Sequence, residues 1–84
     1  MSKEEIKILL VDDEKQFVDT LAERLAMRGF AARVAYDGPQ ALKAVEDPTD
    51  VIVLDLRMPG MDGFEVLRSV KKSNPQVQVI ILTG

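Results

Sequence analysis

Four short apolar segments alternate with more polar, helix-like stretches along this chain of 84 residues. The segments occupy residues 8–11, 30–36, 51–54 and 77–83. Short and nearly continuous apolar runs are typical of strands that are buried on both faces, as in a parallel sheet. The pattern therefore predicts four strands of a parallel sheet.

Three helices are predicted between these strands, because apolar residues recur there at the spacing of one helix face. The predicted inner faces comprise Phe17, Val18, Leu21, Ala22 and Leu25 in the first helix, Ala41, Leu42 and Val45 in the second, and Phe64, Leu67 and Val70 in the third. We expect the three phenylalanines, Phe17, Phe30 and Phe64, to lie in the core. The order β-α-β-α-β-α-β predicts an α/β fold in which helices cover both faces of a doubly wound parallel sheet.

Polar residues and glycines mark the ends of these elements. Asp12 or Asp13 can cap the first helix, and Gly29 suits the left-handed position at its end. Residues 57–63 contain one proline and two glycines and are predicted to form a loop. Asp62 is expected to cap the third helix.

Three carboxylates stand where predicted strands end, and parallel strands end at the same edge of a sheet. Asp12 and Asp13 follow the strand at 8–11, and Asp55 follows the strand at 51–54. Taken alone, the acid pair equally suits a helix N-cap, and Asp55 suits a turn. Together they bring three like charges into close contact, and such groups resist ionising unless a cation lies among them. The pattern predicts a metal-assisted phosphate site.

Composition narrows the function further. The chain has no His and no Cys, which excludes imidazole acid–base catalysis, histidine metal ligands and thiol chemistry. A net charge of −3 with 30% charged residues provides no basic surface, so no direct nucleic-acid contact is expected. The polar start and the short apolar runs predict neither a signal peptide nor a membrane span, and we expect a cytoplasmic protein.

Three motifs, at residues 11–14, 54–63 and 81–84, resemble in order and spacing the receiver domain of two-component response regulators. The resemblance spans the whole chain and implies the flavodoxin-like receiver fold with strand order 2-1-3-4. It also implies a signalling domain rather than an enzyme. Because 84 residues make one domain at most, we expect residues 1–84 to be a single, incomplete receiver domain that lacks the fifth strand and the last two helices.

The resemblance implies a role for each residue of the site. Asp55 would be the phosphoacceptor for a sensor histidine kinase or a phosphotransfer protein. Asp12, Asp13 and Asp55 would hold Mg²⁺ together with the backbone carbonyl of Arg57, and an all-oxygen set suits this ion. Thr83 would contact a phosphoryl oxygen after the transfer.

Some family features fall outside these residues. The resemblance implies a phosphoryl-binding lysine and an aromatic switch residue on the fifth strand. Lys71 and Lys72 cannot replace that lysine, because they belong to the far end of the third predicted helix. We expect weak phosphorylation without it. We also expect apolar groups of Ile8 and Leu10 to be exposed and the fourth strand to be an open edge, and both features favour self-association.

Two other functions remain open. One is a non-phosphorylated interaction or assembly module with a receiver-like fold, which would use the exposed edge. The other is a phosphohydrolase that forms an aspartyl-phosphate intermediate, a class that usually carries a second acid two residues after the nucleophile. Arg57 stands at that position, so the hydrolase is the least favoured.

Overall fold

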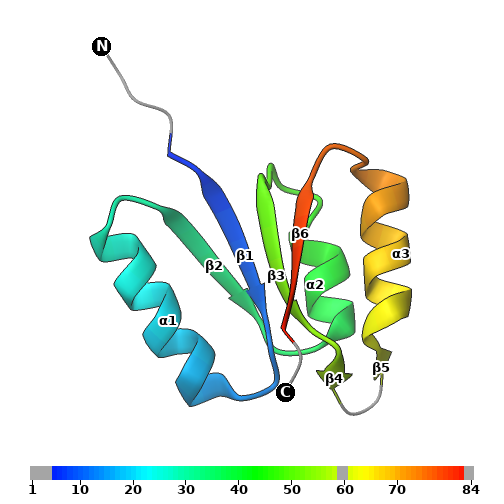
Figure 1. Ribbon diagram of the computed structural model, residues 1–84, viewed down its shortest axis with the longest axis horizontal. Coiled ribbons are helices and arrows are strands. Elements are labelled where there is room, and N and C mark those ends of the chain that lie inside the picture. The colour runs from blue at the N-terminus through cyan, green and yellow to red at the C-terminus, as the bar shows by residue number, and fades with distance from the viewer. Residues whose placement is uncertain (1–4, 59–60, 83–84) are drawn as a thin grey trace.

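Four parallel strands form the central sheet, in the order β2-β1-β3-β6 (Figure 1). The structure is a computed structural model, and it describes residues 5–58 and 61–82. The strands of this sheet are β1 Lys7–Val11, β2 Ala31–Ala35, β3 Val51–Asp55 and β6 Gln78–Leu82. The arrangement confirms the predicted α/β class and the predicted order 2-1-3-4, because β6 is the fourth strand of this sheet along the chain.

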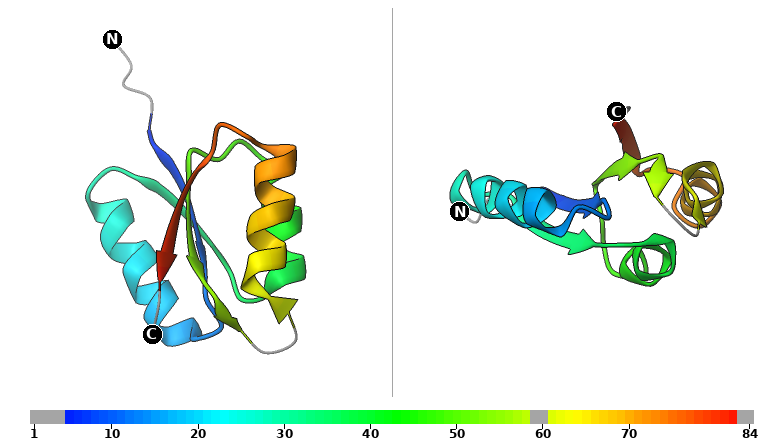
Figure 2. Two further views of the ribbon diagram at one scale, coloured as in Figure 1. Left: turned by 45° about the vertical axis from the view of Figure 1, so that its right-hand side comes forward. Right: turned by 90° about the horizontal axis from the view of Figure 1, so that it is seen from below.

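Helices cover both faces of the sheet, as in a doubly wound fold (Figures 1 and 2). They are α1 Lys15–Met27, α2 Gly38–Ala44 and α3 Gly63–Ser73. On the α1 face, Ile8 and Leu10 of β1 form a buried cluster with Val18. On the opposite face, Leu9 and Val11 belong to the larger core that α2 and α3 cover. Successive residues of β1 therefore enter different cores, which explains why this strand is apolar at nearly every position.

Gly29 ends α1 with a φ of +94°, in the left-handed region that glycine adopts at little cost. Its N–H donates to the carbonyl of Ala26 at 3.1 Å, and the N–H of Phe30 donates to the carbonyl of Leu25 at 3.1 Å. This pair of bonds is the Schellman motif, which satisfies carbonyls at the helix end. The predicted role of Gly29 is confirmed.

The start of α1 differs from the prediction that Asp12 or Asp13 caps it. The N-cap residue is Glu14, and its side chain makes no capping hydrogen bond. Asp12 Oδ1 instead accepts the N–H of Glu14 at 3.0 Å, within the turn that separates β1 from α1. Because this turn intervenes, both aspartates stay at the end of the strand.

The segment predicted as a loop contains a short antiparallel pair, β4 Arg57–Met58 with β5 Met61–Asp62. Two-residue strands are too short for hydrophobic periodicity to reveal them. Met58 is 7% exposed and joins the larger core, so it anchors this pair beneath the end of β3. Asp62 caps α3 as predicted, because its Oδ1 accepts the N–H of Phe64 at 2.9 Å.

Two of the three phenylalanines do not lie in the core. Phe17 is 50% exposed and Phe64 is 55% exposed, whereas Phe30 packs partly buried under α1. The buried positions of α3 include Val66 and Val70, four residues apart, so the inner face is rotated away from Phe64. The spacing predicts both phenylalanines at inner positions, whereas the structure buries Val18 beside Phe17 and Val66 two residues after Phe64.

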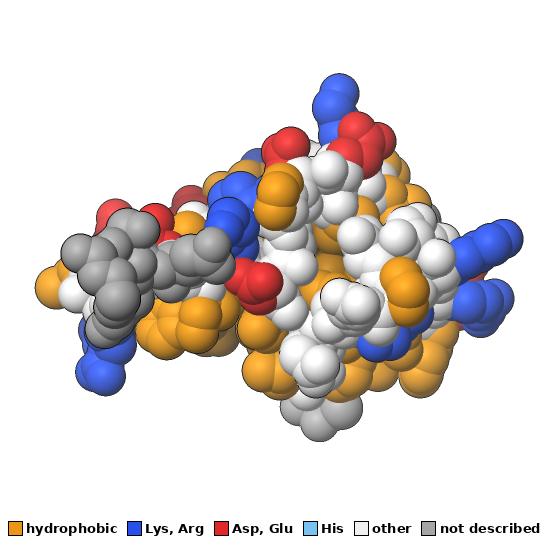
Figure 3. All heavy atoms as spheres, turned by 90° about the horizontal axis from the view of Figure 1, so that it is seen from above, with side chains coloured by type: hydrophobic (Ala, Val, Ile, Leu, Met, Phe, Trp, Pro, Cys, Tyr) orange, Lys and Arg blue, Asp and Glu red, His pale blue; other side chains and the backbone are white. Residues whose placement is uncertain are grey.

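The expected exposure of Ile8 and Leu10 is also wrong, because the two side chains are 7% and 1% exposed beneath α1. Exposure falls instead on Ile80 of β6, at 52%. Ile80 pairs with Val53 on β3, and its strand lies at the edge of the sheet opposite β2. Seen from the amino ends of the strands, charged side chains of both signs are scattered and hydrophobic ones reach the surface along one side (Figure 3). Within the described ranges, no helix has the length and hydropathy needed to cross a bilayer.

Candidate metal and phosphoryl site

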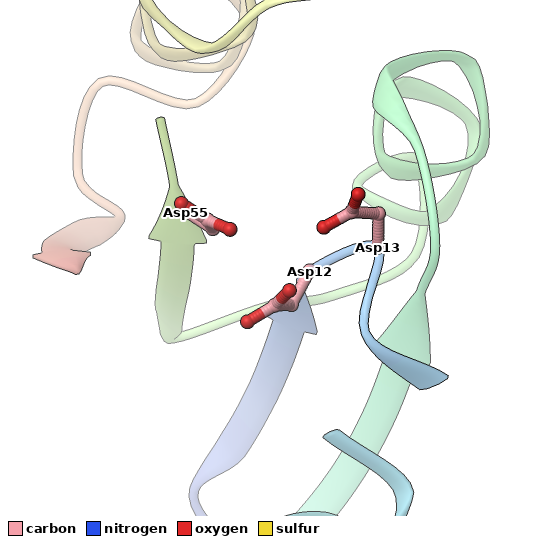
Figure 4. A group of neighbouring side chains, drawn as sticks. All are labelled: Asp12, Asp13 and Asp55. Carbon is pink, nitrogen blue, oxygen red and sulfur yellow. The ribbon is translucent and has the colours of Figure 1, made fainter. Parts of the chain in front are cut away.

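The register of the sheet brings the predicted carboxylates together. Val11 pairs with Leu54, so the next residues of the two strands, Asp12 and Asp55, lie side by side at the carboxyl edge. Asp13 follows in the turn, and its carboxylate points toward that of Asp55 (Figure 4). One carboxylate oxygen from each aspartate lies within 4.8 Å of the other two.

Asp12 is the buried member of this cluster, with 6% of its surface exposed. Its backbone N–H donates to the carbonyl of Ala35 at 3.1 Å, which fixes the residue against β2. Burial raises the pKa of Asp12 above its ordinary value of 3.8, against the lowering effect of the Glu14 N–H, and the charges of Asp55 and Asp13 raise it further. Asp12 therefore resists ionisation, as expected for a buried acid beside like charges and without a counter-charge.

Asp55 is half-buried at the end of β3. Its Oδ1 accepts the N–H of Arg57 at 2.9 Å, which fixes the orientation of the carboxylate. Arg57 opens β4, where it pairs with Asp62. Through the pairing of β4 with β5, the segment that follows Asp55 therefore connects the acidic cluster with the start of α3.

The cluster fits a divalent cation of the magnesium type. Mg²⁺ takes about six oxygen ligands at roughly 2.0–2.1 Å, so adjacent ligand atoms lie about 3 Å apart and opposite ones about 4.2 Å apart. Oxygens already within 4.8 Å of one another need only small side-chain movements to meet these distances. The donor set is also correct, since carboxylate oxygens are the hard ligands that this ion prefers.

The structure thus brings Asp12, Asp13 and Asp55 together, and it places the backbone of Arg57 beside them. Thr83 lies outside the described residues. Lys71 lies at the opposite end of the sheet, where its Nζ donates to the carbonyls of Pro75 at 3.0 Å and Val77 at 2.9 Å. It therefore cannot act at the acidic cluster, as its place in the third helix predicted.

Sequence reasoning missed two contributors near Asp55. The first is the Arg57 N–H, although an Asp two residues before a donor is a recognisable Asx-turn pattern. The second is Gly63, for which the sequence predicts only a place in the loop at residues 57–63. Its close approach to Leu56 is visible only in three dimensions.

The doubly wound parallel sheet, with three acids at its carboxyl edge, is consistent with the flavodoxin-like receiver fold. Over residues 8–84 the chain matches the response regulator receiver domain family. The chain belongs to this family of two-component signalling domains.

Similar proteins agree. The transcriptional regulatory protein CpxR of Escherichia coli is 43% identical over 78 residues, which cover 93% of this chain and 33% of CpxR. The response regulator MprA of Mycobacterium ulcerans is 34% identical over 80 residues, covering 94% of this chain and 34% of MprA. The chain thus spans about a third of the length of these curated relatives.

Two solved structures are also similar. The response regulator TrrA of Thermotoga maritima, in complex with Mg²⁺-BeF, has a TM-score of 0.84 and 35% identity, with 93% of this chain and 69% of TrrA covered. A response regulator of Burkholderia pseudomallei with a phosphorylated aspartic acid, a calcium ion and citrate has a TM-score of 0.89 and 30% identity. That match covers 95% of this chain and 48% of the other.

Proposed function

We propose that Asp55 accepts a phosphoryl group from the phosphohistidine of a sensor kinase or phosphotransfer protein. The observation that carries this proposal is the convergence of three carboxylates from β1, its following turn and β3 within 4.8 Å. A carboxylate oxygen of Asp55 attacks the phosphorus atom, so an O–P bond forms and the P–N bond breaks. The bonding electron pair leaves with the imidazole nitrogen, which takes up a proton.

Asp12, Asp13, Asp55 and the backbone carbonyl of Arg57 would hold Mg²⁺ at this edge. When bound, the ion would offset the negative charge that spreads over the transferring phosphoryl oxygens. The protein itself contributes orientation, because the Arg57 N–H holds Asp55 Oδ1 at 2.9 Å. Asp12 contributes a second fixed carboxylate, since Ala35 and Glu14 bond its backbone and side chain.

The remaining assignments rest on family membership. Thr83 follows Leu82, which pairs with Asp55 across the sheet, so it is the natural contact for a phosphoryl oxygen. We propose that residues 1–84 belong to a single receiver domain that acts in the cytoplasm as a phosphorylated signal carrier and not as an enzyme. The domain makes no direct nucleic-acid contact in this proposal, which its net charge of −3 supports.

Incubation with acetyl phosphate and Mg²⁺, followed by intact mass measurement, tests the proposal. We expect the mass to rise by one phosphoryl group in the wild-type chain and not in Asp55→Asn, which keeps the size and the Arg57 hydrogen bond. Omission of Mg²⁺ is expected to suppress the gain. No gain in the wild type, or an equal gain in Asp55→Asn, would overturn the assignment.

A second candidate, an assembly module, is favoured by the 52% exposure of Ile80 on β6. Within the described residues, β6 pairs only with β3, and an unpaired strand edge is a template for another chain. We propose that copies of this chain associate through this strand. Sedimentation at rising concentration is expected to show association that Ile80→Asp weakens and Asp55→Ala leaves unchanged. A monomer at all concentrations would remove this candidate.

A further inference from the structure

Gly63 lies closer to the backbone of Leu56 than any residue with a side chain could. It is buried as the first residue of α3, and a Cβ built on it would lie 2.7 Å from Leu56 Cα and 3.2 Å from Leu56 O. Cβ atoms essentially never approach backbone atoms to 2.7 Å. Its φ does not lie in the positive region, so glycine is required here by space and not by backbone conformation.

The atoms that Gly63 approaches belong to the peptide that holds Asp55. The Leu56 oxygen and the Arg57 N–H are the two polar groups of one peptide unit. In a planar trans peptide these groups point in opposite directions, and no cis peptide is found in the described chain. The oxygen side faces Gly63, while the N–H side donates to Asp55 Oδ1 at 2.9 Å.

The helix α3, which begins at Gly63, is held firmly in place by its buried residues and its N-cap. Val66 and Val70 of α3 are 0% and 1% exposed in the larger core. Asp62 caps the same helix through the N–H of Phe64. If Gly63 gained a Cβ, the Leu56–Arg57 peptide would shift more readily than α3, because Leu56 is only partly buried whereas Val66 and Val70 are fully buried.

We propose that Gly63 is a positioning residue for the acceptor site. Its missing side chain lets α3 set the plane of the Leu56–Arg57 peptide, and that plane aims the Arg57 N–H at Asp55. The carbonyl of Arg57 follows in the same segment, so the plane also sets one oxygen proposed for Mg²⁺. This inference rests on the proposed function, and it assigns to α3 the orientation of the acceptor carboxylate.

The test compares two glycine variants of the full chain, Gly63→Ala and Gly29→Ala. Gly29 has a φ of +94°, and among the described residues nothing lies within 4 Å of where its Cβ would be, so its variant strains the backbone far from Asp55. Urea unfolding measures the stability lost by each, and isothermal titration calorimetry with Mg²⁺ alone measures affinity.

We expect Gly63→Ala to weaken Mg²⁺ binding about tenfold or more, as changes to groups that orient metal ligands do. Gly29→Ala should stay within about twofold of wild type, because distant sites act independently.

A double variant separates backbone approach from side-chain packing. Leu56 Cδ2 is also close, at 2.9 Å, but removing it leaves the backbone contact at 2.7 Å. Leu56→Ala combined with Gly63→Ala is therefore expected not to restore Mg²⁺ affinity. Restored affinity in the double variant, or equal Mg²⁺ affinity for Gly63→Ala and Gly29→Ala, would overturn the inference.

If Gly63→Ala does not fold, NMR of the wild-type chain replaces it. The Arg57 amide proton is expected to lie downfield and to lose this shift in Asp55→Ala, and an amide without such a shift overturns the inference. Failure of the wild type to bind Mg²⁺ or take up a phosphoryl group defeats the proposed function instead. The two failures are therefore distinguishable.

Discussion

The two ends of the sheet use polar residues in opposite ways. At the amino end, polar side chains bond to the backbone of the turns that feed the strands. Arg33 donates to the carbonyl of Ala44 at 2.8 Å, to Thr49 Oγ1 at 2.6 Å and to the carbonyl of Pro48 at 3.3 Å. These bonds add to the turn's own, because the Ala44 carbonyl also accepts the N–H of Asp47 at 3.1 Å and Thr49 Oγ1 donates to the carbonyl of Asp47 at 3.0 Å.

At the carboxyl end, the polar residues oppose one another. Asp12, Asp13 and Asp55 gather within 4.8 Å, and the pKa of Asp12 is raised by burial and by its two acidic neighbours. Bringing these carboxylates together lowers the free energy of unfolding, and a bound cation would raise it again. This contrast supports the proposal that the carboxyl end of the sheet binds a cation, whereas polar residues at the amino end stabilise the fold. Variants at the two ends should therefore separate stability from binding.

The largest expected effect is on Mg²⁺ affinity, in Asp12→Asn. We expect affinity to fall by about 100-fold, the upper end of the range for groups that orient ligands, because here a proposed ligand is itself lost. Asparagine still accepts the Glu14 N–H, and it removes a buried charge. The free energy of unfolding without Mg²⁺ should thus stay equal or rise by up to about 1 kcal/mol. Calorimetry and urea unfolding measure the two quantities.

The matched control is Glu46→Gln, which removes one exposed acid away from the cluster. It should change neither quantity beyond about 0.5 kcal/mol. A large stability loss in Asp12→Asn without Mg²⁺ would contradict the comparison, because Asp12 would then support the fold.

The opposite outcome is expected at the amino end, in Arg33→Met. Methionine keeps much of the apolar stem and removes the donors to Ala44 and Thr49. Loss of these bonds should lower the free energy of unfolding by about 1–3 kcal/mol, since hydrogen bonds made by a charged donor typically contribute about this much. The ion pair with Asp47, at 3.8 Å and largely exposed, adds little to this figure. Mg²⁺ affinity should not change.

Arg33→Lys tests whether geometry or charge matters. Lysine keeps the charge, but it lacks the planar guanidinium with which Arg33 reaches three acceptors at once. Arg33→Lys should therefore keep only part of the stability that Arg33→Met loses. Full recovery would show that charge alone holds α2, and a loss of Mg²⁺ affinity in either variant would break the separation between the two ends.

The sequence predicted the sheet well because the informative residues lie close together in the chain. Continuous apolar runs identified the strands, and Asp55 follows its run directly, so its place at the carboxyl edge needed no tertiary information. The cluster followed from topology once the first and third strands were neighbours, an order that came from the family resemblance. Register then made Asp12 and Asp55 adjacent.

The errors arose where tertiary packing decides. Phe17 and Phe64 have the right spacing for inner positions, but α1 buries the neighbouring Val18, which was also predicted, and α3 buries Val66, which was not. Periodicity cannot choose between neighbouring apolar residues at the edge of one face. The role of Gly63 was hidden for a similar reason, because a close approach between α3 and Leu56 joins elements that no local pattern connects.

The smallest expected effect is the pH dependence of stability without Mg²⁺. Because the pKa of Asp12 is raised above 3.8, the folded chain binds its proton more tightly than the unfolded chain does. The contribution of Asp12 to the free energy of unfolding is therefore fully present below pH 3.8 and is lost as the pH rises through the raised pKa.

Other carboxylates titrate in the same range, so the measurement is the difference between wild type and Asp12→Asn in urea unfolding at several pH values. This difference should move against the wild type as pH rises and reverse with saturating Mg²⁺, since the ion binds the ionised form. A difference that is flat in pH would mean that Asp12 ionises as readily in the folded chain as in the unfolded one, and the carboxyl end would then carry no electrostatic strain for a cation to relieve.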